Sequence, residues 1–273
     1  MKAKKILFIA ALVILLAVFT VSAVYIISYF AEGAKQQAQY DELAGIVESI
    51  QQATAETDGS TENTHTENSD TEESTEATRP EGEILPEYAP LYEMNGDLVG
   101  WLRIDGTNVN YPVMQTPNSP DFYLYKNFSK EYSARGCLYV RESCDVVTPS
   151  DNVTIYGHNM NDGTMFHDLR YYDDPAYFEA HPIIVFDTLT ERHTYQIFAV
   201  FKTTATVGKG FEYHKFENAA TKAEFNAFVA QCKNLAFYNT GFAPQYGDKI
   251  ICLSTCEYTL ENGRLVVAAY RIS

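Results

Sequence analysis

The sequence has few cysteines and no paired metal-binding spacing. Its five cysteines include no CxxC motif and are odd in number, so we expect no disulfide framework and at least one free thiol. The sequence also does not group the further ligands that a metal site would need. We therefore expect no metal and no cofactor. In an extracellular protein, an unpaired cysteine is a candidate reactive group.

Basic residues are also scarce. The chain has 20 Lys and Arg against 36 Asp and Glu, a formal net charge of −16. Residues 31–83 contain 14 of the acids and only 2 of the bases, so most of the excess is local. A nucleic-acid-binding protein needs a basic face, so we expect no nucleic-acid partner.

Charged residues are absent from Ile6 to Phe30, directly after three lysines. As a helix, these 25 residues would be about 37 Å long, enough to cross a hydrocarbon core of about 30 Å. A signal peptide cleaved after Ala23 is the alternative, but its apolar core would be long and apolar sequence continues beyond that site. Bases before the span and acids after it predict a single-pass protein in the cytoplasmic membrane, with a cytoplasmic N-terminus and an extracellular remainder.

Large apolar residues are almost missing from Gln51 to Glu83. Such a segment cannot bury enough surface to offset its ordering entropy, so we expect a disordered spacer there. We expect the whole of Glu32–Glu83 to be a tether that adds nothing to the fold. From Ala34 to about Ile50 the pattern is compatible with a short helix. The predicted organisation is a cytoplasmic tail (1–5), a transmembrane anchor (6–30), an acidic extracellular linker (31–83) and a globular domain (84–273).

Short β-type runs dominate the globular domain. The predicted strands are Asn108–Met114, Gly136–Arg141, Asn152–Tyr156, Ile183–Asp187, His193–Thr203, Lys249–Ser254 and Leu265–Ile272. Helices are predicted at Pro86–Trp101, near Met165–Tyr171 and at Asn218–Asn234. Many short strands with few helices predict a mainly β fold, a closed or nearly closed β-barrel with peripheral helices.

Three residues at strand ends are candidates for chemistry. Cys256 ends a strand at a polar Ser-Thr-Cys sequence, whereas Cys252 within that strand suits a core position. His158 follows another strand in a glycine-containing loop, and an imidazole there could polarise a thiol. Arg264 opens the last strand, and a cation beside a thiol favours a thiolate and offers donors to an oxyanion. Taken singly, each of these three also fits an ordinary structural role.

Taken together, these residues resemble the signatures of sortases. The strings that carry the resemblance are Leu253-Ser254-Thr255-Cys256 with Arg264, and Tyr156-Gly157-His158-Asn159-Met160 leading to Gly163-Thr164-Met165-Phe166. The second string, the region from Asp121 to Val140 and the segment from Asp174 to Pro182 are similar to class B sortases in particular. The resemblance covers roughly Leu85 to Ser273, which would make 84–273 a sortase-like catalytic domain with the sortase β-barrel.

The resemblance implies a cysteine transpeptidase. Cys256 would attack the carbonyl after a threonine in a sorting signal and form a thioacyl enzyme, which a primary amine resolves. His158 would be the acid and base, and Arg264 would hold the oxyanion. The candidate substrate-binding residues are Asn159, Ser254, Thr255 and Tyr258.

The implied partners are surface proteins that carry a sorting signal, and either a peptidoglycan precursor amine or a pilin lysine amine. An extracellular binding or adhesion module with a structural Cys256 is the alternative from another class. A papain-like protease would place its cysteine before its histidine, at the start of a helix. One departure from the family pattern is Cys137, which with Cys144 raises a possible disulfide.

Overall fold

The computed structural model describes residues 2–57 and 82–273. These residues fall into two compact units, which divide between Glu42 and Leu43. The greater part of the predicted spacer, residues 58–81, lies outside the described residues.

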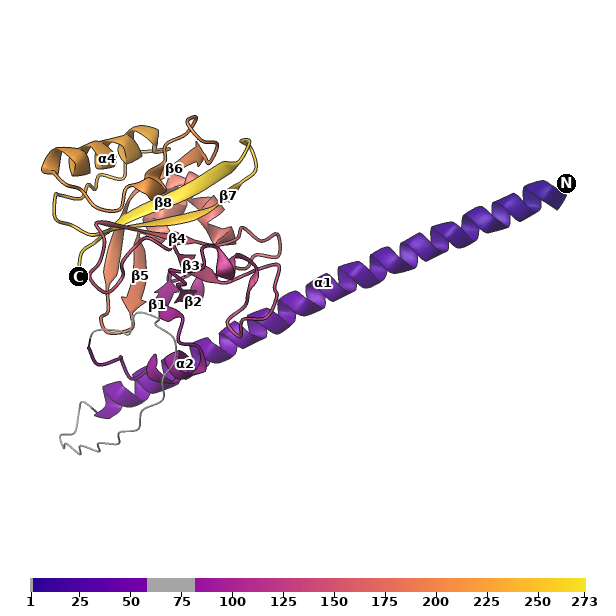
Figure 1. The fold of residues 1–273 in the computed structure, drawn as a ribbon, viewed down its shortest axis with the longest axis horizontal. Coiled ribbons are helices and arrows are strands. Elements are labelled where there is room, and N and C mark those ends of the chain that lie inside the picture. The colour runs from indigo at the N-terminus through magenta and orange to yellow at the C-terminus, as the bar shows by residue number, and fades with distance from the viewer. Residues whose placement is uncertain (1, 58–81) are drawn as a thin grey trace. The chain divides into compact units, whose positions relative to one another are not determined.

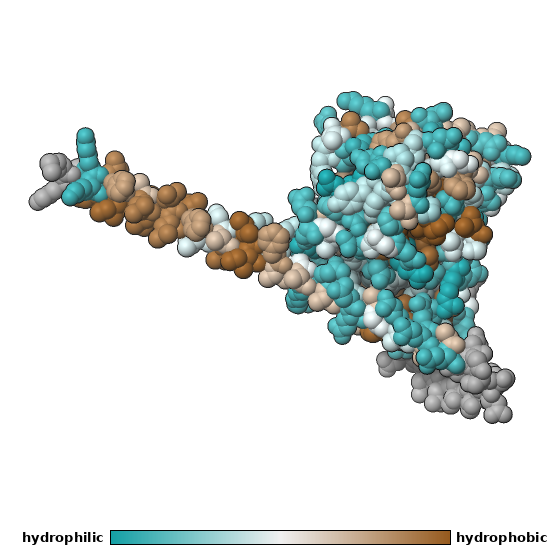
Figure 2. Space-filling view, turned by 180° about the vertical axis from the view of Figure 1, so that it is seen from behind, coloured by the Kyte–Doolittle hydropathy of each residue, from teal (hydrophilic) through white to brown (hydrophobic). Residues whose placement is uncertain are grey.

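The first unit is the N-terminal part of helix α1, which runs from Lys2 to Thr57. Its side chains from Ile6 to Phe30 are largely exposed and apolar, and brown predominates along this segment in Figure 2. The helix is long and apolar enough to cross a membrane, with a hydropathy of 2.9 in its most apolar window. An exposed apolar surface of this length is stable as a helix in lipid, because its backbone polar groups bond internally.

The second unit is built on a closed barrel with the strand order β1-β2-β3-β4-β7-β8-β6-β5 (Figure 1). The strands are β1 Leu98–Arg103, β2 Asn110–Met114, β3 Leu138–Val140, β4 Asn152–Tyr156, β5 Ile183–Thr188, β6 Thr194–Thr204, β7 Ile250–Glu257 and β8 Gly263–Arg271. The pairings β2–β3 and β4–β7 are parallel, and the others are antiparallel. The predicted mainly β, barrel-type fold is confirmed.

Short helices surround the barrel. They are α2 Ala89–Met94, η1 Phe122–Tyr125, η2 His167–Asp173, α3 Pro175–Ala180, η3 Tyr213–Lys215 and α4 Lys222–Leu235. Thr221 caps α4 by accepting a hydrogen bond from the Glu224 amide. The apolar face of α4, with Phe225 and Phe228, packs into a core formed with β6, β7 and β8 (Figure 1). The helix predicted at Asn218–Asn234 therefore exists, shifted slightly along the chain.

The helical structure predicted at Pro86–Trp101 is present in its first half, as α2, and wrong in its second half. Helix α2 ends at Met94, and Asn95 has extended dihedrals of −151° and 104° before the chain enters β1. Leu98 and Trp101, which we assigned to one helical face, lie on β1 and pair with residues of β2. Their separation of three residues fits a helix and not the alternation of a strand, but β1 pairs with both β2 and β5, with a register shift between Leu98 and Gly100.

The structure also contradicts part of the expectation that the linker adds nothing to the fold. Helix α1 continues to Thr57, and both Leu43 and Val47 are buried in the second unit. Gln51 Nε2 donates a hydrogen bond of 3.2 Å to Glu87 Oε1. Leu43 and Val47 are four residues apart and so share one helical face, which is enough to pack this turn of helix on the barrel. A spacer that adds nothing to the fold remains a proposal for later residues only.

Replacing Val47 by Ala should lower the free energy of unfolding of the second unit by about 1–3 kcal/mol, because two buried methyl groups are lost. Denaturant unfolding of a chain that begins before Leu43 measures this. Ser49→Ala, at an exposed position of the same helix, is the matched control. Equal stability of both variants would restore the spacer interpretation for this segment.

Candidate active site

The pairing of β7 with β8 places Cys256 directly opposite Arg264, and Glu257 opposite Gly263. Directly opposed residues of an antiparallel pair have their side chains on the same face, with Cβ atoms about 5 Å apart. The five residues from Tyr258 to Asn262 connect the strands. A two-residue turn at Asn262-Gly263 would have moved Arg264 away from the thiol. The structure has the wider connection that a role for Arg264 requires.

Strand β4 brings His158 to the same end of the barrel. Tyr156 pairs with Ser254 of β7, and the Gly157 amide donates to the Ser254 carbonyl at 3.1 Å. A Cβ atom at Gly157 would overlap the side chains of Leu138 and Phe166. Glycine therefore lets the chain leave β4 close to the barrel wall, which places the next residue beside the thiol-bearing strand.

The imidazole of His158 is half-buried and is held by helix η1. Its Nε2 lies 2.8 Å from the carbonyl oxygen of Leu124. Because a carbonyl oxygen only accepts, Nε2 carries the proton in this arrangement. Among the described residues no hydrogen bond joins His158 to Cys256, so the structure orients the ring without a direct thiol contact.

One cleft of about 380 Å³ brings the three candidate residues together. Its lining includes His158, Cys256 and Arg264, together with Ser254 and Thr255. Its other lining residues are Asp121, Leu124, Tyr139, Arg141, Glu142, Tyr156, Gly157, Thr204, Ala205, Phe211, Tyr213 and His214.

The four candidate substrate-binding residues occupy different positions. The Ser254 hydroxyl is buried and lies 2.5 Å from the Tyr213 hydroxyl, and Thr255 Oγ1 is buried without a partner among the described residues. Asn159 Nδ2 donates to the Cys256 carbonyl at 3.2 Å. Tyr258 is 74% exposed, and its hydroxyl donates to the Asn159 carbonyl at 3.4 Å. Asn159 and Tyr258 thus act on the backbone around the thiol, and neither belongs to the cleft lining.

The Arg264 guanidinium is half-buried and bonds to its own turn. Nη1 donates to the carbonyls of Gly263 at 2.9 Å and Asn262 at 3.4 Å. The hydrogen bonds described for the guanidinium do not include the Cys256 sulfur. Burial raises the pKa of Tyr139 and of Tyr213 in the cleft, and the positive charge of Arg264 lowers both pKa values by a smaller amount.

The other cysteines are structural. All five thiols are free, so the possible Cys137–Cys144 disulfide is not formed. Burial raises the pKa of Cys252 well above its ordinary value and that of Cys144 to about 11. Both thiols are therefore protonated and unreactive, whereas Cys256 is partly exposed.

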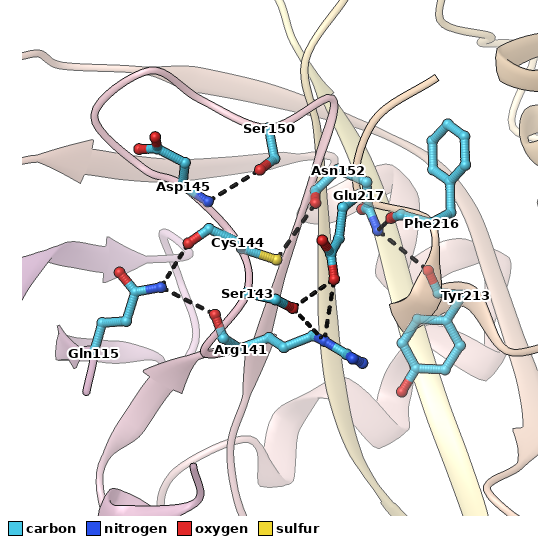
Figure 3. Close-up of polar contacts among 10 residues, drawn as sticks. All are labelled: Gln115, Arg141, Ser143, Cys144, Asp145, Ser150, Asn152, Tyr213, Phe216 and Glu217. Atoms are coloured by element: carbon cyan, nitrogen blue, oxygen red, sulfur yellow. Dashed lines mark hydrogen bonds and ion pairs between the residues drawn. The ribbon is translucent and has the colours of Figure 1, made fainter. Parts of the chain in front are cut away.

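Sequence reasoning missed the wall of the cleft that contains Arg141, Tyr213 and His214. Arg141 and Ser143 both reach Glu217, and Asn152 Nδ2 donates to the carbonyls of Tyr213 and Phe216 (Figure 3). These contacts fix the segment that carries Tyr213 and His214 against β4. The partners are more than sixty residues apart in sequence, so no local pattern indicates them.

His214 on this wall has a lowered pKa. Burial lowers it most, the charges of Arg141, Lys215 and Arg264 add to the effect, and Glu212 opposes it. Each nearby cation makes the imidazolium less stable. The ring is therefore neutral at neutral pH and can accept as well as donate a hydrogen bond in the cleft.

Replacing Arg264 by Ala should raise the pKa of His214, because one of the cations that destabilise its imidazolium is removed. An NMR titration of the imidazole resonances measures the shift. Arg271→Ala, at the other end of β8, is the control and should leave His214 unchanged. An unchanged pKa in Arg264→Ala would mean that the guanidinium does not act on this wall.

Comparison with known proteins identifies the family and the fold. A sortase domain matches residues 102–272. Sortase B of Listeria monocytogenes is 34% identical over 192 residues, 70% of this chain and 76% of the relative, and sortase B of Staphylococcus aureus is 30% identical over 194 residues, 70% and 77%. The structure of the Staphylococcus aureus sortase B–substrate complex matches with a TM-score of 0.71 and 25% identity, over 89% of this chain and 98% of that one.

The chain belongs to the sortase family. Its relatives and structural neighbours assign it to class B, so it is a class B sortase-type cysteine transpeptidase. The resemblance drawn from the cysteine and histidine strings is thereby confirmed, and a binding module with a structural cysteine is not supported.

Proposed function

We propose that this enzyme cleaves a C-terminal sorting signal after a threonine and transfers the surface protein to an amine. The observation that carries the proposal is the opposition of Cys256 and Arg264 on β7 and β8, in a cleft that His158 also lines. A nucleophile, an acid–base group and an oxyanion donor are the three groups that acyl transfer requires.

In the first half-reaction the Cys256 sulfur bonds to the carbonyl carbon of the threonine. The peptide C–N bond breaks, and the leaving amine takes its proton from His158, which gives a thioacyl enzyme. Arg264 stabilises the negative charge that develops on the carbonyl oxygen. A guanidinium has five N–H donors, and the described bonds use only Nη1, so other donors remain for the oxyanion.

In the second half-reaction a primary amine attacks the thioester carbon. The C–N bond forms, the C–S bond breaks, and a proton of the amine passes to His158 as the Cys256 thiolate leaves. Thiolate and imidazolium then form the pair that begins the next cycle. His158 thus serves once as acid and once as base.

Substrate contacts and location complete the proposal. Class B sortases commonly accept signals of the Asn-Pro-x-Thr kind, and we propose that Asn159, Ser254, Thr255 and Tyr258 shape the backbone and cleft that receive such a signal. The acceptor is a peptidoglycan precursor amine or a pilin lysine. The apolar helix anchors the enzyme in the cytoplasmic membrane with its N-terminus inside, and the catalytic domain 84–273 acts outside.

Replacing Cys256 by Ala should abolish cleavage of sorting-signal peptides and trapping of the thioacyl enzyme. Its melting temperature should stay within a few degrees of the wild type, because a partly exposed thiol contributes little packing. Mass spectrometry of the enzyme incubated with peptide measures the covalent adduct.

Cys252→Ala is the control and should still cleave, since that thiol lies in the core. Cleavage that survives in Cys256→Ala and disappears in Cys252→Ala would show that the nucleophile is assigned to the wrong cysteine.

Replacing Arg264 by Ala should reduce kcat by about 10²–10³-fold with a smaller change in KM, because an oxyanion donor is lost. Arg264→Lys should recover only part of the rate, since an ammonium keeps the charge but loses the planar fork. Steady-state peptide cleavage measures both variants. A kcat near that of the wild type in Arg264→Ala would remove this residue from the mechanism.

A further inference from the structure

The cleft contains a fixed carboxylate that the mechanism above does not use. We propose that Asp121 binds the ammonium group of the incoming acceptor and holds it beside His158. The inference rests on the proposed function, and it assigns to this chain the group that receives the second substrate.

Asp121 is held in place from both its backbone and its side chain. It stands immediately before helix η1 with φ 58° and ψ 15°, in the left-handed region that non-glycine residues seldom adopt. Its side chain does not cap η1 and instead accepts a hydrogen bond of 2.8 Å from the Tyr139 hydroxyl at Oδ1. Burial raises the pKa of Tyr139, so that hydroxyl stays protonated and remains a donor.

The second oxygen of this carboxylate has no partner among the described residues. Several other carboxylates of the domain do pair with a cation: Asp97 with Lys130, Asp162 with Arg135 and Glu257 with Lys202. The described ion pairs do not include Asp121, although Arg141 and Arg264 line the same cleft. A fixed carboxylate that faces a reaction cleft without a cation is suited to a cationic ligand.

The position of Asp121 indicates that its cationic ligand is the acceptor amine. The backbone amide of Leu124 donates to the Asp121 carbonyl, and the Leu124 carbonyl in turn accepts from His158 Nε2. The Asp121 carboxylate and the His158 imidazole are thus both positioned by the segment from Asp121 to Leu124. The amine must give a proton to His158 when it attacks the thioester. An ammonium group bound by Asp121 is held near His158, as the second half-reaction requires.

The acceptor gives up two protons in this reaction. The acceptor binds as an ammonium and loses one proton to solvent before it attacks. Its second proton passes to His158 as the C–N bond forms and the C–S bond to Cys256 breaks. Asp121 takes no part in the proton transfers and forms no covalent bond.

Asp121→Asn tests the charge alone. Asparagine tolerates the left-handed conformation, and its amide oxygen can still accept from Tyr139. With triglycine amide as acceptor at neutral pH and low salt, we expect the ratio of transpeptidation to hydrolysis to fall by about threefold to fivefold, as for the loss of a solvent-exposed ion pair. Added salt should lower the ratio in the wild type and have little effect in the variant.

Hydroxylamine, which is uncharged at neutral pH, provides the discriminating comparison. Its transfer relative to hydrolysis should be the same in wild type and Asp121→Asn, because it gains nothing from a carboxylate. Asp121→Glu, which keeps the charge, should recover part of the transfer to triglycine amide. Glu142→Gln removes a carboxylate that lines the same cleft and has no hydrogen bond described for its side chain, and it should leave the ratio unchanged.

Three results would overturn the inference: an unchanged ratio in Asp121→Asn, an equal loss with hydroxylamine, or the same loss in Glu142→Gln. An equal fall in transpeptidation and hydrolysis would also overturn it, since Asp121 would then serve the formation of the thioacyl enzyme. Failure of the proposed function would be seen differently, as absence of peptide cleavage or of transfer to any amine in the wild type.

Discussion

The register between β7 and β8 is the constraint on which the cleft depends. Cys256 lies opposite Arg264 only because five residues, Tyr258 to Asn262, join the two strands. The connection is not a free loop, since Thr204 donates to the Glu261 carbonyl and the Ala205 amide donates to the Asn262 carbonyl. A connection of fixed length and fixed contacts thus sets which side chain faces the thiol.

Much of the barrel and of the site could be predicted from sequence because the information is local. Short β-type runs indicated seven of the strands, and the strings around His158 and Cys256 indicated the family. Leu98 and Trp101 were misread because their separation of three residues is typical of a helical face, whereas pairing of β1 with β2 and β5 makes this segment a strand. The packing of Leu43 and Val47 was missed because the acidic residues around them dominate the composition.

The wall of the cleft that contains Arg141, Tyr213 and His214 could not be predicted, and the reason is different. Its contacts join Arg141 to Glu217 and Asn152 to Tyr213, residues far apart in the chain without a shared motif. They are a consequence of how the segment after β6 is folded back on β4. A sequence without aligned relatives carries no signal for such pairs, whereas a thiol or histidine in a familiar string carries one.

The parallel pairing of β4 with β7 also has a kinetic consequence. Tyr156 and Ser254, which flank the imidazole and the thiol, are neighbours in the barrel although about a hundred residues separate them in the chain. Contacts of such high sequence separation form slowly, because the entropy of closing a long loop must be overcome before the pairing stabilises it. The histidine strand β4 cannot be completed in the barrel until the cysteine strand β7 pairs with it. The reactive pair is therefore assembled only when the barrel closes.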